Sequence, residues 1–208
     1  MARLGAEVVG IDAAEENIEC AKQHASNDPI GNLKYNIMWR LAILTALLAE
    51  KSIVNQPIND FLVAGRVRYI CTTVESFAKD QSKQPNFDAV VASEVIEHVD
   101  NPPHFVTTCT SLIDDGGSFF LTTINRTQRS YVGAILAAEY VLRLLPTGTH
   151  DWNKFITPHE LQDMLKNSGS KFRVRMLQGM FYFPFFDKWT WISDTGVNYA
   201  LHAVKTKP

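Results

Sequence analysis

Three side chains that could hold a metal ion or move a proton lie within five residues of one another, directly after a short apolar run. The sequence Ser93-Glu-Val-Ile-Glu-His98 follows Phe87–Ala92. If a helical turn begins at Glu94, then Glu94, Glu97 and His98 lie at positions i, i+3 and i+4 and share one face. Two carboxylates and an imidazole can hold a divalent cation, or His98 can act as a general base. The alternative is that the acids only stabilise a helix N-terminus.

A second candidate is Asp12, at the end of an expected strand over Ala6–Asp12 and ahead of an expected helix over Glu15–Ala25. An acid at the end of an early strand commonly accepts hydrogen bonds from the ribose hydroxyls of a nucleoside cofactor. The same side chain could instead cap the helix that follows it. The local pattern leaves both interpretations open.

Strands and helices alternate along the chain, which predicts an α/β sheet. Phe87–Ala92 has the apolar run of a buried parallel strand. Asp12 and Ser93 each end an expected strand, and ligands of open α/β sheets bind at the carboxyl ends of strands. The other expected strands are 67–72, 118–124, 172–180 and 197–204, and the other expected helices are 74–80, 104–113 and 157–167. The last of these has Thr157 as its N-cap and Pro158 at its first position.

The composition bounds the class of protein. The chain has 208 residues, of which 46% are hydrophobic and 20% charged, and this favours one folded domain. Its net charge of −2 disfavours nucleic acid as a partner, because phosphate binding needs a basic face. Three distant cysteines indicate free thiols. The most apolar stretch, Ile37–Ala49, contains Arg40 and is shorter than the roughly 20 residues that span a bilayer.

Two segments interrupt the alternation of strands and helices. Ile37–Gly65 is an atypical insert with an apolar run and a polar tail. Asn125–Pro146 combines apolar residues with three arginines and a single acid, Glu139. A basic segment with an apolar face suits a helix at a membrane surface, although a buried lid helix is equally consistent.

Together these stretches resemble the class I S-adenosylmethionine-dependent methyltransferases and, more narrowly, the ubiquinone-biosynthesis O-methyltransferases. The likeness is carried by Leu4–Ile18, Phe87–His98, Ser118–Thr127, Gly148–Trp152 and Asp194–Ala200. It implies one doubly wound, Rossmann-like domain over residues 1–208 with an antiparallel C-terminal hairpin. The family's glycine-rich loop and first strand would precede Met1, so we expect the sheet to lack its first strand.

The resemblance implies S-adenosylmethionine and Mg²⁺ as cofactors and methylation of catechol-type hydroxyls on polyprenylated ubiquinone precursors. It implies that Asp12 binds the ribose, that Ser93 lies against the cofactor, and that Val74 and Glu75, with Thr73, lie near the adenine. It also implies that Glu94, Glu97 and His98 bind magnesium, with proton removal by His98 as the alternative role. Magnesium prefers oxygen ligands, so direct coordination by His98 would be unusual.

The resemblance further implies that residues 125–152 face the membrane or the substrate. The expected location is the matrix face of the mitochondrial inner membrane, as a peripheral protein among other ubiquinone-biosynthesis proteins, although the chain opens with no transit-peptide pattern. One alternative is a catalytically dead chain that acts only as an interaction subunit, because the glycine-rich loop is not in this sequence. Another is methylation of a different small phenol.

Overall fold

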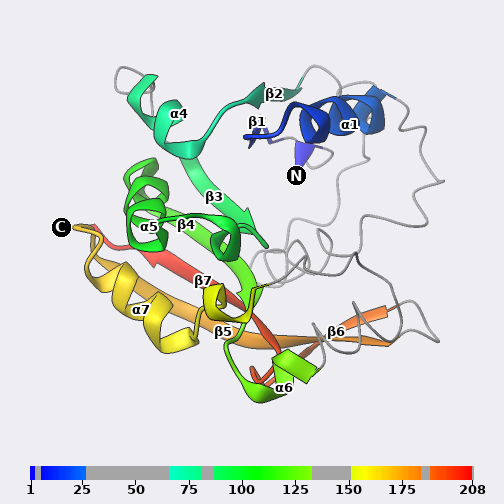
Figure 1. Cartoon of the computed structure of the whole chain (residues 1–208). Helices are drawn as coiled ribbons and strands as arrows, with labels where there is room; N and C mark the ends of the chain where they lie inside the picture. Colours follow the sequence, from blue (N-terminus) through cyan, green and yellow to red (C-terminus); the bar gives the residue numbers. More distant parts are fainter. Residues whose placement is uncertain (3–5, 27–65, 81–86, 133–150, 184–187, 208) are drawn as a thin grey trace, which may run out of the picture. The chain divides into compact units, whose positions relative to one another are not determined.

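The structure, a computed structural model, describes residues 1–2, 6–26, 66–80, 87–132, 151–183 and 188–207 (Figure 1). These residues belong to two compact units, Met1–Ser82 and Lys83–Pro208, and each unit is described by itself. The expected insert at 37–65 lies outside the described residues, as does most of the segment 125–152.

The first unit contains a parallel pair of strands. β1 (Val8–Asp12) pairs with β2 (Val67–Cys71) in a register that runs from Val8 opposite Val67 to Asp12 opposite Cys71. Two helices follow the strands, α1 (Glu15–Ser26) after β1 and α4 (Val74–Asp80) after β2. Each helix therefore begins at the carboxyl end of a strand, as the alternating pattern predicts.

The second unit contains a five-stranded sheet in the order β3-β4-β7-β5-β6. β3 runs parallel to β4, and all the other neighbours are antiparallel. The strands are β3 (Phe87–Ser93), β4 (Ile113–Ile124), β5 (Phe172–Phe183), β6 (Lys188–Ile192) and β7 (Asn198–Lys205). The helices are η4 (Ile96–His98), α5 (Pro102–Ser111), α6 (Gln128–Ser130), η6 (Trp152–Lys154) and α7 (Pro158–Lys166). The α/β class and the antiparallel pairing near the C-terminus are confirmed.

The core of the second unit lies around the middle of this sheet. The last six residues of β4, Phe119–Ile124, are all buried, and so are Tyr199 and Leu201 on the neighbouring β7. α5 contacts β4 and α7 contacts β5, and the two helices also contact each other. Burial along consecutive strand residues means that both faces of β4 are covered.

Several boundaries differ from the sequence prediction; β4 begins at Ile113 and not at Ser118, so the expected helix 104–113 ends earlier, at Ser111. α5 begins at Pro102 and not at His104, because a proline in the first turn needs no hydrogen-bond acceptor and Asn101 caps the helix through a 3.1 Å bond from the His104 amide. Strand β6 was not predicted, and β5 continues three residues further than expected, to Phe183. Within the described part of the chain, no helix has the length and hydrophobicity needed to cross a membrane.

Candidate functional site

The carboxyl end of β3 is joined to β4 by polar contacts. Ser93 lies opposite Thr122 in the register, and the two hydroxyl oxygens are 3.0 Å apart. The Glu94 amide donates to the Thr122 carbonyl over 3.0 Å. Glu94 then adopts a φ of 53°, in the left-handed region that residues with a side chain rarely occupy. Such strain is concentrated at functional sites, so the chain is bent where the sequence places its candidate acids.

Two carboxyl groups meet in the interior just after this bend. Glu97 is only 3% exposed, and its Oε2 accepts a 2.8 Å hydrogen bond from the Thr123 hydroxyl. Within the described residues, Oε1 of Glu94 and Oε1 of Glu97 are both shielded from solvent and have no hydrogen-bond partner. Burial, followed by the nearby Glu97 carboxyl, raises the pKa of Glu94 to about 8. Glu94 is therefore protonated at neutral pH when no cation is bound.

His98 does not join this pair in the way that the helical spacing predicted. The 3-10 helix begins only at Ile96, and Glu94 lies outside it with a left-handed backbone. The expected helical turn from Glu94 is therefore wrong, and the three side chains do not share one helical face. Glu97 is buried, whereas His98 is exposed. Across the described ranges, no three His, Cys, Asp or Glu side chains lie together as a metal-binding group.

The buried pair nevertheless has the donor chemistry of a magnesium site. Magnesium is usually held by one or two protein carboxylates and keeps several water ligands. Glu94 and Glu97 each offer a buried oxygen without a described partner, and a bound cation would satisfy both. These two carboxylates fit the ion, while the role of His98 as a ligand stays a prediction.

Asp12 lies at the end of β1, in the turn that leads into α1. Its Oδ1 accepts a 2.8 Å hydrogen bond from the Ala14 amide, and its Oδ2 accepts a 3.1 Å bond from the Asn17 side chain. A carboxylate has about four acceptor positions, so these two contacts leave room for hydroxyl donors. The expected capping of the α1 backbone is therefore not realised, because the Ala14 amide precedes the helix and Asn17 donates through its side chain, while ribose binding stays a prediction.

The loop predicted to lie near the adenine begins beside Asp12. The Thr72 amide donates to the Asp12 carbonyl over 2.8 Å, which joins the carboxyl ends of β2 and β1. Thr73 then caps α4 by accepting a 3.2 Å bond from the Ser76 amide. Val74 is buried and Glu75 is partly buried in the first turn of that helix. The first unit therefore brings Asp12 and residues 73–75 to one edge, whereas Ser93, Glu94, Glu97 and His98 belong to the second unit.

Sequence reasoning missed two threonines on β4 that contact Ser93, Glu94 and Glu97. Thr122 and Thr123 are fully buried on β4, beside Ser93 and Glu97 respectively. A usable signal was present, because β4 follows β3 as the next parallel strand and ligand-binding groups gather at the carboxyl ends of such neighbours. The sequence Leu-Thr-Thr-Ile near the end of β4 marks that position.

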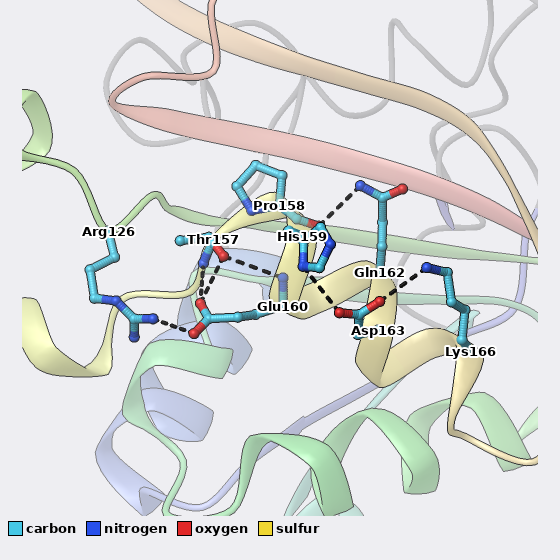
Figure 2. Close-up of polar contacts among 8 residues, drawn as sticks. All are labelled: Arg126, Thr157, Pro158, His159, Glu160, Gln162, Asp163 and Lys166. Carbon is cyan, nitrogen blue, oxygen red and sulfur yellow. Dashed lines mark hydrogen bonds and ion pairs between the residues drawn. The ribbon is translucent and has the colours of Figure 1, made fainter.

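A polar cluster joins the beginning of the segment 125–152 to residues that follow its end (Figure 2). The Arg126 guanidinium donates to Glu160 and, over 3.0 Å, to the Phe155 carbonyl. Glu160 Oε2 also accepts bonds from the Thr157 amide and hydroxyl, both at 2.8 Å. Partial burial by itself would raise the pKa of Glu160, but the bonds from Thr157 and Arg126 outweigh it and hold that pKa below its usual range.

A further hydrogen bond joins the beginning and the end of the segment 125–152 directly. The Trp152 indole donates to the Thr127 carbonyl over 2.9 Å. The capping box Thr157-x-x-Glu160 could be read from the sequence, but its link to Arg126 could not, because the two lie 34 residues apart. Residues 133–150, between these ends, lie outside the described residues.

The comparisons with known proteins agree with one another on the family of this chain. Residues 1–173 match the family model described as a methyltransferase domain. Over its full length the chain is 38% identical to the mitochondrial ubiquinone biosynthesis O-methyltransferase of Rattus norvegicus, of which it covers 50%. It is 35% identical over its full length to the ubiquinone biosynthesis O-methyltransferase of Marinobacter nauticus, of which it covers 71%. The chain thus spans about half the length of the rat relative and over two thirds of the bacterial one.

Solved structures agree on the fold. A magnesium protoporphyrin IX methyltransferase from Synechocystis, determined with bound S-adenosylhomocysteine, matches with a TM-score of 0.53 at 15% identity, covering 99% of this chain and 67% of that one. A Methanosarcina mazei S-adenosylmethionine-dependent methyltransferase matches with a TM-score of 0.54 at 14% identity, covering 100% of this chain and 86% of that one. At these identities the likeness establishes the class I methyltransferase fold and no substrate.

Proposed function

Because this chain belongs to the ubiquinone biosynthesis O-methyltransferase family, we propose that it methylates polyprenylated ubiquinone precursors. The methyl donor is S-adenosylmethionine, and the acceptors are catechol-type hydroxyls, as in 3-demethylubiquinol and polyprenyl dihydroxybenzoate. The observation that carries the proposal is the 35% identity along the whole chain to a relative of which the chain covers 71%. The buried carboxyl pair at the end of β3 supports it.

The proposed cofactor contacts are assigned in each unit separately, at the carboxyl ends of β1 and β2 in the first unit and of β3 in the second. Asp12 accepts hydrogen bonds from the ribose hydroxyls at the positions that Ala14 and Asn17 leave open. Val74 and Glu75 line the adenine, and Ser93 lies against the cofactor. These assignments rest on the family resemblance together with the placement of each residue at the carboxyl end of a strand.

The chemistry needs an activated phenol and a dry, aligned site. Glu94 and Glu97 are the residues that would hold a magnesium ion, through their buried oxygens. A cation beside a catechol oxygen lowers the pKa of the hydroxyl, and S-adenosylmethionine supplies an electrophilic methyl group. His98 accepts the phenol proton as a general base. The protein then only has to align the oxygen with the methyl carbon, since no covalent enzyme intermediate is needed.

The setting that we propose is the matrix face of the mitochondrial inner membrane. Relatives from Rattus norvegicus, Dictyostelium discoideum and Homo sapiens carry mitochondrial names. The segment 125–152 would make the peripheral membrane contact or face the substrate's long tail. Its described beginning supports this, because Tyr131 and Val132 are exposed although they are apolar. Other ubiquinone-biosynthesis proteins are the proposed partners.

The first test is calorimetric titration of the chain with S-adenosylhomocysteine, with and without Mg²⁺. We expect micromolar binding that is lost in Asp12→Ala. Asn17→Ala is the matched control, because it removes the donor to Asp12 Oδ2 and leaves the carboxylate in place. Binding that survives in Asn17→Ala but not in Asp12→Ala would assign the contact to the carboxylate itself.

Two results would overturn this proposal. A folded chain that shows no binding of S-adenosylhomocysteine cannot be the methyltransferase on its own, and the interaction-subunit alternative would replace it. Binding that is equally strong in Asp12→Ala would remove the ribose role of Asp12. If binding is found, methyl transfer to a water-soluble catechol and to a polyprenylated one should be compared, because the proposal requires the polyprenylated acceptor to be preferred.

A further inference from the structure

The outer end of β5 and the whole of β6 form a two-stranded ribbon. The last pair between β5 and the main sheet joins Gln178 to Ala200, whereas β5 pairs with β6 from Gly179 to Phe183. β6 is the edge strand, with β5 as its only neighbour in the described sheet (Figure 1). A two-stranded ribbon buries little surface by itself and is only marginally stable in water.

Aromatic rings cover both faces of this ribbon. Phe181 and Phe183 are two residues apart, so they share one face, and their ring centroids are 4.8 Å apart. Tyr182 lies on the opposite face with its cross-strand partner Trp189, at a centroid distance of 5.1 Å. Phe181, Tyr182 and Phe183 are 48%, 36% and 42% exposed. Three successive exposed aromatic residues are unusual on a water-facing surface.

The distribution of these rings favours a lipid surface over a protein partner. Taking about 200 Å² for each side chain, the three exposed rings offer roughly 250 Å². A standard protein interface buries about 800 Å² on each partner. A protein groove or a second copy would also cover only one face of the ribbon and leave the other ring pair in water. The headgroup region of a bilayer surrounds an inserted ribbon on all sides, and Trp and Tyr are the residues enriched there.

Two neighbouring features fit the same environment. Lys188 is exposed directly opposite Phe183 in the register, and a lysine ammonium at such a position can reach lipid phosphates. α6 is joined to the turn after β6, because Arg129 pairs with Asp194 at 2.7 Å, and Tyr131 and Val132, which follow α6, are also exposed apolar residues. Asn125 reinforces that connection with a 2.8 Å bond to the Thr195 carbonyl.

We propose that the β5–β6 ribbon, residues 179–183 and 188–192, inserts its aromatic side chains into the interfacial region of a lipid bilayer. The inference extends the membrane contact proposed for the segment 125–152 to a second element. It rests on exposure and strand register, and it needs neither cofactor binding nor methyl transfer.

The test is flotation of the full chain with vesicles of phosphatidylcholine containing a minority of phosphatidylglycerol. The double variant Phe181→Ser, Phe183→Ser should lower the partition coefficient about tenfold or more, since two exposed rings are removed. Val174→Ser is the matched control, because Val174 is an exposed apolar residue near the other end of β5 and should leave binding unchanged. Phe181→Trp should keep or strengthen binding, because tryptophan is also enriched at membrane interfaces. Binding retained in Phe181→Trp and lost in the double variant would assign the loss to the missing rings and not to a general effect of substitution at position 181.

A second measurement locates the ribbon in the bilayer. Brominated phosphatidylcholine should quench part of the tryptophan fluorescence of the wild-type chain, and replacing both ribbon tryptophans, Trp189→Phe and Trp191→Phe, should remove that part. Unchanged flotation of the double variant would overturn the proposal, and so would a loss as large in Val174→Ser. A concentration-dependent dimer in gel filtration that the double variant abolishes would assign the rings to self-association instead. A chain that binds S-adenosylhomocysteine but fails the flotation test keeps its proposed function and loses only this inference.

Discussion

Two groups of carboxylates in the second unit lie in opposite environments. Glu94 and Glu97 meet in the interior, and in the described structure each has one buried oxygen without a hydrogen-bond partner. Glu160 is instead held by donors from Arg126 and Thr157 (Figure 2). The pKa is raised to about 8 at Glu94 and lowered at Glu160. The same side chain therefore acts as a neutral acid in one place and as a fixed anion in the other.

The difference separates a candidate reaction site from a structural one. A satisfied network such as that of Glu160 lowers the free energy of the folded state and leaves nothing for a ligand to complete. Buried oxygens without partners cost free energy unless a ligand or ion uses them. The backbone strain at Glu94 occurs in the unsatisfied group, as expected where structure serves chemistry. The Glu94–Glu97 pair is therefore where binding should change stability most.

The largest expected effect is that of Glu94→Gln on the pH dependence of stability. Because the pKa of Glu94 rises from 4.5 to about 8 on folding, the folded state retains a proton that the unfolded chain releases. The free energy of unfolding of the wild type should then fall as the pH rises from about 4.5 to about 8, by roughly 2 kcal/mol after relaxation of the site. Glutamine mimics the protonated acid, so urea unfolding of the variant should lack this decline.

Adding Mg²⁺ to the same unfolding measurement tests the proposed cation site at Glu94 and Glu97. At a pH near 8, added Mg²⁺ should raise the unfolding midpoint of the wild type, because binding to the folded state stabilises it. Glu94→Gln should abolish that shift, while Asp88→Asn, a carboxylate on β3 outside the pair, should retain it. A wild-type stability that is flat between pH 4.5 and 8 would contradict the neutral Glu94. A magnesium shift of equal size in Glu94→Gln would contradict the cation site.

The alternation of strands and helices was predictable because each strand or helix depends on a local pattern in the sequence. The helix after Thr157 followed from Thr157 as its N-cap and Pro158 at its first position, and the strand 87–92 from its apolar run. The antiparallel C-terminal pairing came only from the family resemblance. β6 was missed because its Trp and Lys residues belong to an aromatic-rich stretch without a clear period of two.

The geometry of the candidate site was less predictable. The types and positions of Glu94, Glu97 and His98 were evident in the sequence, but their shared helical face was not realised. The left-handed backbone at Glu94 occurs where its amide bonds to Thr122, 28 residues away, and a periodic sequence pattern carries no information on such a contact. The link of Arg126 to Glu160 was hidden for the same reason. Sequence spacing therefore located the chemistry, whereas tertiary contacts decided which groups meet.

A smaller effect is expected for Arg126→Met, which removes one of the donors to Glu160. The change removes the donor to Glu160 and to the Phe155 carbonyl, but Thr157 still supplies two hydrogen bonds to Glu160. We expect a loss of about 1 kcal/mol in the free energy of unfolding at pH 7. Arg129→Met is the control, since its ion pair with Asp194 is largely exposed and should contribute nothing measurable. Equal losses in the two variants would mean that the Arg126 cluster is an ordinary surface contact.

The smallest expected effect is that of Glu160→Gln, and its pH dependence has the opposite sign to that of Glu94. The folded state lowers the pKa of Glu160, so the stability gained from its charge is present above pH 4.5 and is lost as the pH falls through the folded value. Glutamine keeps the capping box and removes only the charge beside Arg126, which is partly exposed, so roughly 0.5 kcal/mol should be lost at pH 7. Unfolding curves below pH 4.5 should converge for wild type and variant. A gap that persists there would mean that the capping geometry, and not the carboxylate charge, was disturbed.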